Sequence, residues 1–244
     1  MPPTLLRQWF LAGLRHLLPC TCALCGAVQR ELVCAGCMGD LAPLLHRRRC
    51  IQCAIALEPR HLARHCQACL AGVPDFDATV VIADYGWPLD HLVTGLKFRA
   101  QLPLAAWLAE RLADRLNDAL ATTPSGFPDQ LLSVPLSSAR LRSRGYNQAW
   151  EIARRLGQRL DIPAQADGLR RVRDNPAQAT LDRAERLANL QGAFEVTTRA
   201  RVAGHHIGVV DDVMTTGATL GEIATQLKRA GAACVTNVVA LRTP

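Results

Sequence analysis

The chain has 244 residues, of which 49% are hydrophobic and 20% charged, so it can bury a large core and lacks the composition of a disordered protein. Its formal net charge of +7 favours anionic partners such as phosphates, nucleic acid or a membrane surface, without choosing among them. No apolar run is long and uncharged enough to cross a bilayer, which excludes a transmembrane protein.

The first segment, residues 4–18, has the apolar spacing of an amphipathic helix. Arg7 and Arg15 interrupt its apolar run, which is not the pattern of a secretory signal peptide. This helix is expected either to dock on its own protein or to contact a membrane or a membrane partner. We therefore expect a cytoplasmic protein, either free or peripheral at the inner membrane.

Residues 20–74 form a cysteine-rich module with eight cysteines in four Cys-x-x-Cys pairs. Two such turns supply the four thiolates of a closed, tetrahedral and therefore structural zinc site. We expect two Zn²⁺ sites with sequential pairing, although the spacing also permits interleaved pairing: the first from Cys22, Cys25, Cys34 and Cys37, the second from Cys50, Cys53, Cys66 and Cys69. The run Arg47–Arg49 is interpreted either as a phosphate contact or as a solvated basic turn.

From Phe76 onward, strand-like and helical segments alternate, which predicts an α/β domain over residues 75–244 with a mostly parallel sheet flanked by helices. The domain order is thus an N-terminal helix (1–19), a zinc-ribbon module (20–74) and this α/β domain. Strands are expected at 79–83, 131–134, 167–172, 207–210 and 234–241. Helices are expected at 89–98, 102–120, 148–160, 181–189 and 220–230, with a loop at 122–128.

The sharpest signal is the segment that follows the apolar strand 207–210. Asp211 and Asp212 stand at the carboxyl end of that strand, where open α/β sheets bind ligands. Residues 215–219 (Thr-Thr-Gly-Ala-Thr) then turn into a helix, which aims backbone N–H groups at one point and favours a phosphate. The two carboxylates suit ribose hydroxyls and a magnesium ion, bound directly or through water.

Residues 209–219 resemble the phosphoribosyl pyrophosphate motif of type I phosphoribosyltransferases. With Val134-Pro135-Leu136, the stretch 144–148 and the cysteine pairs, the chain from about 20 to 242 is similar to the ComF family, competence-related proteins with a zinc ribbon ahead of a phosphoribosyltransferase-like domain.

The resemblance implies that the catalytic pair Asp211 and Asp212 holds the ribose, together with a 5-phosphate loop made of Val213, Met214, Thr215, Thr216, Gly217, Ala218 and Thr219. It also implies a pyrophosphate site after Pro135, formed by Arg140, Arg142, Arg144, Gly145 and Asn147. A hood over the site would include Arg171, Arg173, Gln178, Arg183 and Arg186.

The sequence shows neither a base-binding segment nor a general base, so three functions stay open. The chain could transfer phosphoribosyl, with magnesium, to a nitrogenous acceptor. It could instead sense such a ligand without catalysis while it binds single-stranded DNA and works with competence or DNA-translocation proteins at the inner face of the membrane. Finally, it could be a zinc-ribbon nucleic-acid binder whose second domain is only a scaffold.

Overall fold

A computed structural model describes residues 20–120, 126–173 and 190–244 of the chain. The expected helices at 4–18 and 181–189 and part of the loop at 122–128 lie outside these residues. Two compact units make up the fold, residues 1–46 and 47–244. None of the described helices is long and apolar enough to span a bilayer.

The smaller unit contains two short antiparallel strands and one helix, built around the first two cysteine pairs. The strands are β1 (Cys20–Thr21) and β2 (Val28–Gln29), and the helix is α2 (Ala35–Leu45). Cys34 caps α2, because its Sγ accepts a hydrogen bond from the N–H of Cys37. Leu41 and Leu45 are the buried residues of this helix, so its core is small.

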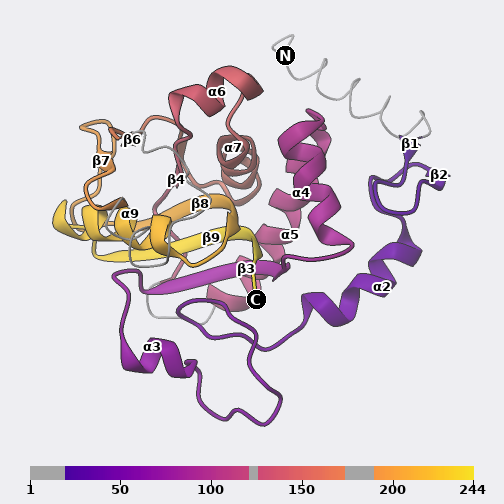
Figure 1. Ribbon diagram of the computed structural model, residues 1–244, viewed down its shortest axis with the longest axis horizontal. Helices are drawn as coiled ribbons and strands as arrows, with labels where there is room; N and C mark the ends of the chain where they lie inside the picture. Colours follow the sequence, from indigo (N-terminus) through magenta and orange to yellow (C-terminus); the bar gives the residue numbers. More distant parts are fainter. Residues whose placement is uncertain (1–19, 121–125, 174–189) are drawn as a thin grey trace. The chain divides into compact units, whose positions relative to one another are not determined.

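The larger unit is built on a five-stranded parallel sheet with strand order β3-β9-β8-β4-β5 (Figure 1). Its strands are β3 (Ala78–Asp84), β4 (Gln130–Ser133), β5 (Ala164–Gln165), β8 (His206–Met214) and β9 (Cys234–Arg242). The two longest strands are adjacent at its centre, and nearly all residues of β9 are buried. A central apolar strand pair of this kind is typical of a sheet covered on both faces.

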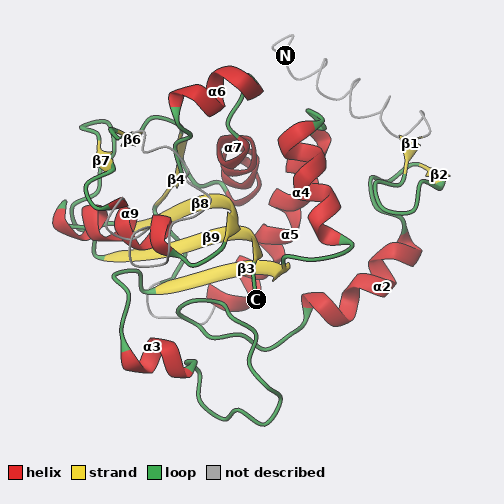
Figure 2. Ribbon diagram, viewed as in Figure 1, coloured by secondary structure: helices red, strands yellow, loops and turns green. Residues whose placement is uncertain are grey.

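Helices cover both faces of the sheet (Figure 2). On one face, α5 (Pro103–Leu120) packs on β3 and β9, and α7 (Gln148–Leu160) packs on β4 and β8. The buried stripe of α5 repeats every four residues, at Leu104, Leu108, Leu112 and Leu116, as an amphipathic helix requires. On the other face, α9 (Ala218–Arg229) packs on β9.

The remaining elements are short. They are α3 (Gln67–Ala71), α4 (Leu89–Phe98), α6 (Ser138–Arg144) and the antiparallel pair β6 (Leu169–Arg171) and β7 (Phe194–Val196). The predicted parallel α/β fold is confirmed, and α4 and α7 begin and end at the predicted residues. One predicted boundary was wrong, because β8 continues to Met214 instead of ending at residue 210. The short elements β5, α6 and β7 were not predicted.

Candidate functional site

The two aspartates lie within the last part of β8, at the carboxyl edge of the parallel sheet. The partner of Asp211 in the register is Val239 of β9, so this residue is still part of the ladder. β8 runs further than its apolar run because β9 pairs with it as far as Met214, opposite Arg242. Both aspartates thus lie near the carboxyl end of the strand, as expected. Their backbone belongs to the strand and not to a loop, which fixes their side chains.

Lys97 of α4 forms an ion pair with Asp212, with 3.0 Å between Nζ and Oδ1. The Asp212 side chain is 11% exposed, so the lysine compensates a carboxylate that is largely removed from water. Next to it, burial and then the charge of Asp212 raise the pKa of Asp211 to about 8. Lys97 was not among the predicted site residues, and its only signal in the sequence is that it is one of two lysines in the chain.

The turn after β8 presents backbone donors at the start of α9. Thr215 and Thr216 are exposed, and Gly217 takes a left-handed conformation with φ of +82° just before the helix. Among the described residues, no protein acceptor binds the backbone N–H groups of Thr216, Gly217 and Thr219. Free N–H groups at a helix N-terminus form an anion site, because the helix dipole adds to the hydrogen bonds.

Three arginines lie on α6, which directly follows the neighbouring strand β4. The Ser137 hydroxyl caps this helix by accepting from the N–H of Arg140, and Gly145 ends it with a φ of +78°. Arg140 and Arg142 are exposed and form no ion pair with the described residues. Because Ser133 of β4 lies opposite Val210 of β8 in the register, the chain leaves β4 toward α6 at the same edge of the sheet as the two aspartates.

The other members of the predicted pyrophosphate group have structural contacts. Arg144 donates to Oε1 of Gln148 (2.9 Å), and its guanidinium carbon lies 5.2 Å from the centre of the Phe98 ring. Asn147 donates through Nδ2 to the carbonyl of Val134 (2.9 Å) and caps α7. These contacts fix the turn between α6 and α7, and the expected role of these residues at a pyrophosphate stays a prediction.

Of the predicted hood, Arg171 and Arg173 lie at the β6 end of the small β6–β7 pair. The Arg171 guanidinium stacks over Phe194, at 5.5 Å from the ring centre. Gln178, Arg183 and Arg186 lie outside the described residues, so the hood stays a prediction as well.

The cysteine pairs assemble in sequential order into two groups of four, with all Sγ atoms of a group within 4.8 Å of one another. In the first group, Sγ of Cys22 lies 3.9 Å from that of Cys37, and Cys25 lies 3.7 Å from Cys34. In the second, Cys53 and Cys66 are 3.6 Å apart. Zn–S bonds of about 2.3 Å in a tetrahedron require sulfur atoms about 3.8 Å apart, so both groups fit zinc.

Backbone donors prepare one thiol of each group for metal binding. Burial opposes ionisation of Cys22, but N–H groups of neighbouring residues outweigh it and lower the pKa of this thiol to about 6. Burial likewise opposes ionisation of Cys50, whose pKa is lowered by the N–H groups of Cys53, Cys66 and Gln52. A thiolate is the form that binds zinc, so these donors favour the metal-bound state.

Within the run Arg47–Arg49, only Arg49 departs from both interpretations, because Arg47 and Arg48 are exposed as in a solvated basic turn. Arg49 is buried and donates to Asp84 at the end of β3 (2.6 Å) and to the carbonyl of Ala54 (3.0 Å). Arg48 donates to the carbonyls of Leu62 and Ala63, within the loop that carries the second cysteine group. Arg48 and Arg49 therefore help to fold that loop, whereas the Arg47 side chain pairs with Asp84 (3.2 Å) and stays 52% exposed.

Comparisons with known proteins agree with this geometry. Residues 141–244 match the family described as "Phosphoribosyl transferase domain". "Competence protein F" of Haemophilus influenzae is 33% identical over 205 residues, which are 84% of this chain and 87% of that protein. "DNA utilization protein YhgH" of Escherichia coli K12 is 36% identical over 186 residues, 76% of this chain and 80% of its own.

Among solved structures, glutamine phosphoribosylpyrophosphate (PRPP) amidotransferase from B. subtilis is 23% identical, with a TM-score of 0.34 over 55% of this chain and 26% of the other. That likeness is weak and concerns the fold alone. The competence and DNA utilization proteins share higher identity with this chain over a larger part of it. This similarity confirms the expected family relationship. The chain belongs to the ComF family of competence proteins, and its larger unit carries a phosphoribosyltransferase-like domain.

Proposed function

We propose that the protein binds phosphoribosyl pyrophosphate with magnesium at the carboxyl edge of β8 and β4. The observation that carries the proposal is the turn at residues 215–219, which has free N–H groups and directly follows a strand with two aspartates near its carboxyl end. The N–H groups of the turn suit an anionic group, and the neighbouring aspartates suit hydroxyl groups. Together they match the phosphate and the hydroxyls of a ribose 5-phosphate. The unpaired arginines of α6 add the donors that a pyrophosphate needs.

Each element has one task in this proposal. The N–H groups of Thr216, Gly217 and Thr219 hold the 5-phosphate, with the dipole of α9 behind them. Asp211 and Asp212 accept hydrogen bonds from the ribose hydroxyls. Arg140 and Arg142 face the pyrophosphate and neutralise its charge as it leaves.

Asp211 and Asp212 also offer the hard oxygen ligands that magnesium prefers. Burial and then the charge of Asp212 raise the pKa of Asp211, and a bound cation would offset both effects. When bound, magnesium would neutralise charge on the pyrophosphate. Lys97 supplies a positive charge from the protein at the same place and orients the Asp212 side chain through the ion pair.

With a nitrogenous acceptor in place, phosphoribosyl transfer would form the new bond at C1 of the ribose as the C1–pyrophosphate bond breaks. Because that carbon becomes positive in the transition state, the protein acts by positioning and charge. The names of the relatives, a competence protein and DNA utilization proteins, support a cellular role of this binding in the uptake or use of DNA.

The test is isothermal titration of the protein with phosphoribosyl pyrophosphate and Mg²⁺. Wild type should bind, the double variant Asp211→Asn/Asp212→Asn should not, and Asp118→Asn, which changes an exposed aspartate of α5, should bind like wild type. Release of pyrophosphate in the presence of a panel of purine, pyrimidine and pyridine bases would establish transfer. The absence of binding by wild type would refute the proposal.

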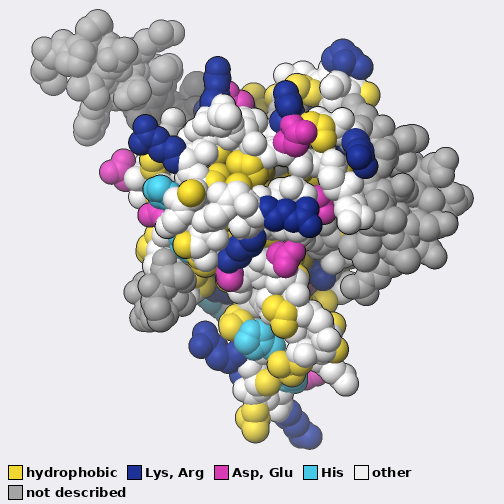
Figure 3. Space-filling view, turned by 90° about the vertical axis from the view of Figure 1, so that its left-hand side faces the viewer, with side chains coloured by type: hydrophobic (Ala, Val, Ile, Leu, Met, Phe, Trp, Pro, Cys, Tyr) yellow, Lys and Arg dark blue, Asp and Glu magenta, His cyan; other side chains and the backbone are white. Residues whose placement is uncertain are grey.

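Single-stranded DNA binding is the second candidate function, and it is favoured by exposed aromatic residues. Trp87 and Phe98, at the two ends of α4, are 77% and 70% exposed, and an aromatic ring beside Arg144 can stack on a base. On the face shown in Figure 3, however, Lys and Arg side chains lie among acidic ones and form no single basic field. Fluorescence anisotropy with an oligonucleotide should therefore show binding that depends only weakly on salt and that the double variant Trp87→Ala/Phe98→Ala loses.

A further inference from the structure

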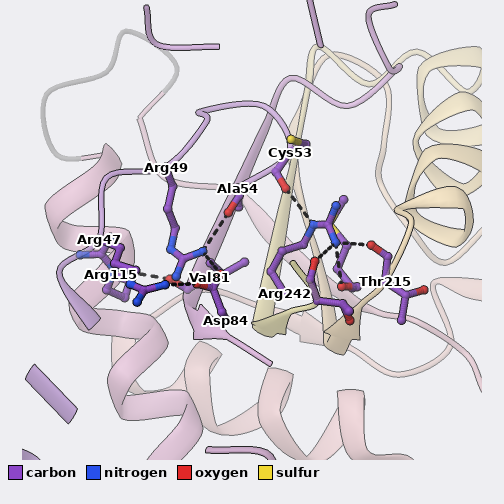
Figure 4. Close-up of polar contacts among 11 residues, drawn as sticks. Arg47, Arg49, Cys53, Ala54, Val81, Asp84, Arg115, Thr215 and Arg242 are labelled. Carbon is purple, nitrogen blue, oxygen red and sulfur yellow. Dashed lines mark hydrogen bonds and ion pairs between the residues drawn. The ribbon is translucent and has the colours of Figure 1, made fainter. Parts of the chain in front are cut away.

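Arg242, the last residue of β9, connects the second cysteine group with the turn that follows β8 (Figure 4). Its Nε donates to the carbonyl of Cys53 at 3.2 Å. Its Nη1 donates to the carbonyl of Met214 at 3.4 Å and to the carbonyls of Thr215 and Thr243. Arg242 is only 9% exposed, so a single buried guanidinium donates to all of these carbonyls.

The cysteine end of this connection is itself held firmly on the sheet. The N–H of Thr79 in β3 donates to the carbonyl of Ile51 (3.0 Å), and its hydroxyl donates to that of Gln52. Gln52 is 6% exposed and donates to the carbonyl of Phe76 (3.0 Å). The second cysteine group therefore lies in the same compact unit as β8 and β9.

The turn end of the connection falls on a peptide group that the proposed function uses. The carbonyl of Thr215 and the N–H of Thr216 belong to one planar peptide unit and point in opposite directions. When Arg242 fixes the carbonyl, it also fixes the direction of the N–H, one of the free donors of the turn. Lysine at this position would carry the charge but not the fork of donors that spans both ends.

We propose that Arg242 is a positioning residue that couples the metal-bound state of the Cys50–Cys53–Cys66–Cys69 group to the phosphate-binding turn. The proposal rests on the proposed function in that the turn binds a phosphate. It assigns the second cysteine group a role beyond local folding, because the geometry of the cysteines sets the Cys53 carbonyl, and this carbonyl orients Arg242.

The coupling is tested by exchanging zinc for Cd²⁺, a softer ion that binds thiolates more tightly and, through its longer metal–sulfur bonds, expands the metal site. In ¹⁵N spectra of the wild-type protein, the amide signals of Thr216 and Gly217 should shift on this exchange. In Arg242→Lys, the cadmium-induced shift should disappear while two metal ions per chain remain bound. Arg115→Lys is the matched control, because Arg115 donates to the sheet carbonyl of Val81 (3.4 Å), has no contact with the turn, and should keep the shift.

A shift that persists in Arg242→Lys, or its absence in wild type, would overturn the proposal. Titration with phosphoribosyl pyrophosphate and Mg²⁺ gives a second readout. Leaving buried carbonyls without a donor should weaken binding roughly tenfold or more in Arg242→Lys. By linkage, the ligand should slow zinc release to a chelator in wild type but not in this variant. If wild type binds no ligand, the proposed function fails, whereas the cadmium shifts still decide on the coupling.

Discussion

Replacing Gly217 with alanine should destabilise the protein and remove its phosphate site. The φ of Gly217 is +82°, in the left-handed region, where a residue with a Cβ costs about 1–3 kcal/mol. A Cβ there would also lie 2.6 Å from the terminal methyl of Met214. That methyl ends a flexible side chain that can move away, so the backbone strain dominates. For a chain of this size, a loss of about 1–3 kcal/mol lowers Tm by about 2–12 °C.

Gly221, one turn into the same helix, provides the matched control. Its φ is not in the left-handed region, and a Cβ added there would meet no atom within 4 Å. Alanine is favoured over glycine inside a helix by about 1 kcal/mol, so Gly221→Ala should raise Tm by about 2–4 °C. The same substitution four residues apart thus has opposite expected signs.

Differential scanning calorimetry measures the stability of both variants, and titration with phosphoribosyl pyrophosphate measures their binding. Gly221→Ala should bind like wild type. Gly217→Ala should bind at least tenfold more weakly, because a strain of this size shifts the turn away from the conformation that aims its N–H groups. If Gly217→Ala were as stable as wild type, the left-handed turn would not be required, and the phosphate site built on it would be refuted.

Three further outcomes are expected. Lys97→Met should lower the free energy of unfolding by about 1–3 kcal/mol, because it leaves a largely buried carboxylate unpaired. In a double-mutant cycle measured by urea unfolding, adding Asp212→Asn should restore most of this loss. Cys25→Ser should reduce bound zinc from two ions to one by metal analysis while ligand affinity stays unchanged, since its group lies in the smaller unit. Glu151→Gln should destabilise the protein at neutral pH. Burial opposes the charge of Glu151, but its two arginine partners lower its pKa below 4.5. The difference in unfolding free energy from wild type should therefore vanish as the pH falls through that lowered value, and a pH-independent difference would contradict this.

The elements that sequence analysis placed correctly are those with a local cause. The apolar spacing of α4 and α7 needs no distant partner, so both helices begin and end at the predicted residues. β7 has three residues and one partner, β6, and such a short pair has no periodic signal. The extension of β8 beyond its apolar run depends on the register with β9, which local sequence does not contain.

The candidate site divides in the same way. The aspartate pair, the threonines and Gly217 are consecutive, and their order alone indicates a strand end, a turn and a helix start. Lys97 and Arg242 contact this segment from distant parts of the chain and are selected by the packing of α4 and the pairing of β9. A contiguous motif therefore predicts its own local structure, but not the distant residues that hold that segment in place.

The shared Cys-x-x-Cys pairs also conceal a difference between the two cysteine groups. The first group packs with short strands and a helix that buries only two residues, so its metal stabilises little beyond its own unit. The second is tied to β3 through Thr79 and to β9 through Arg242, two neighbouring strands of the sheet. Energy released when zinc binds a disordered site is folding energy. In the second group that energy stabilises the edge of the sheet as well, and through Arg242 it reaches the turn where we propose that the phosphate binds.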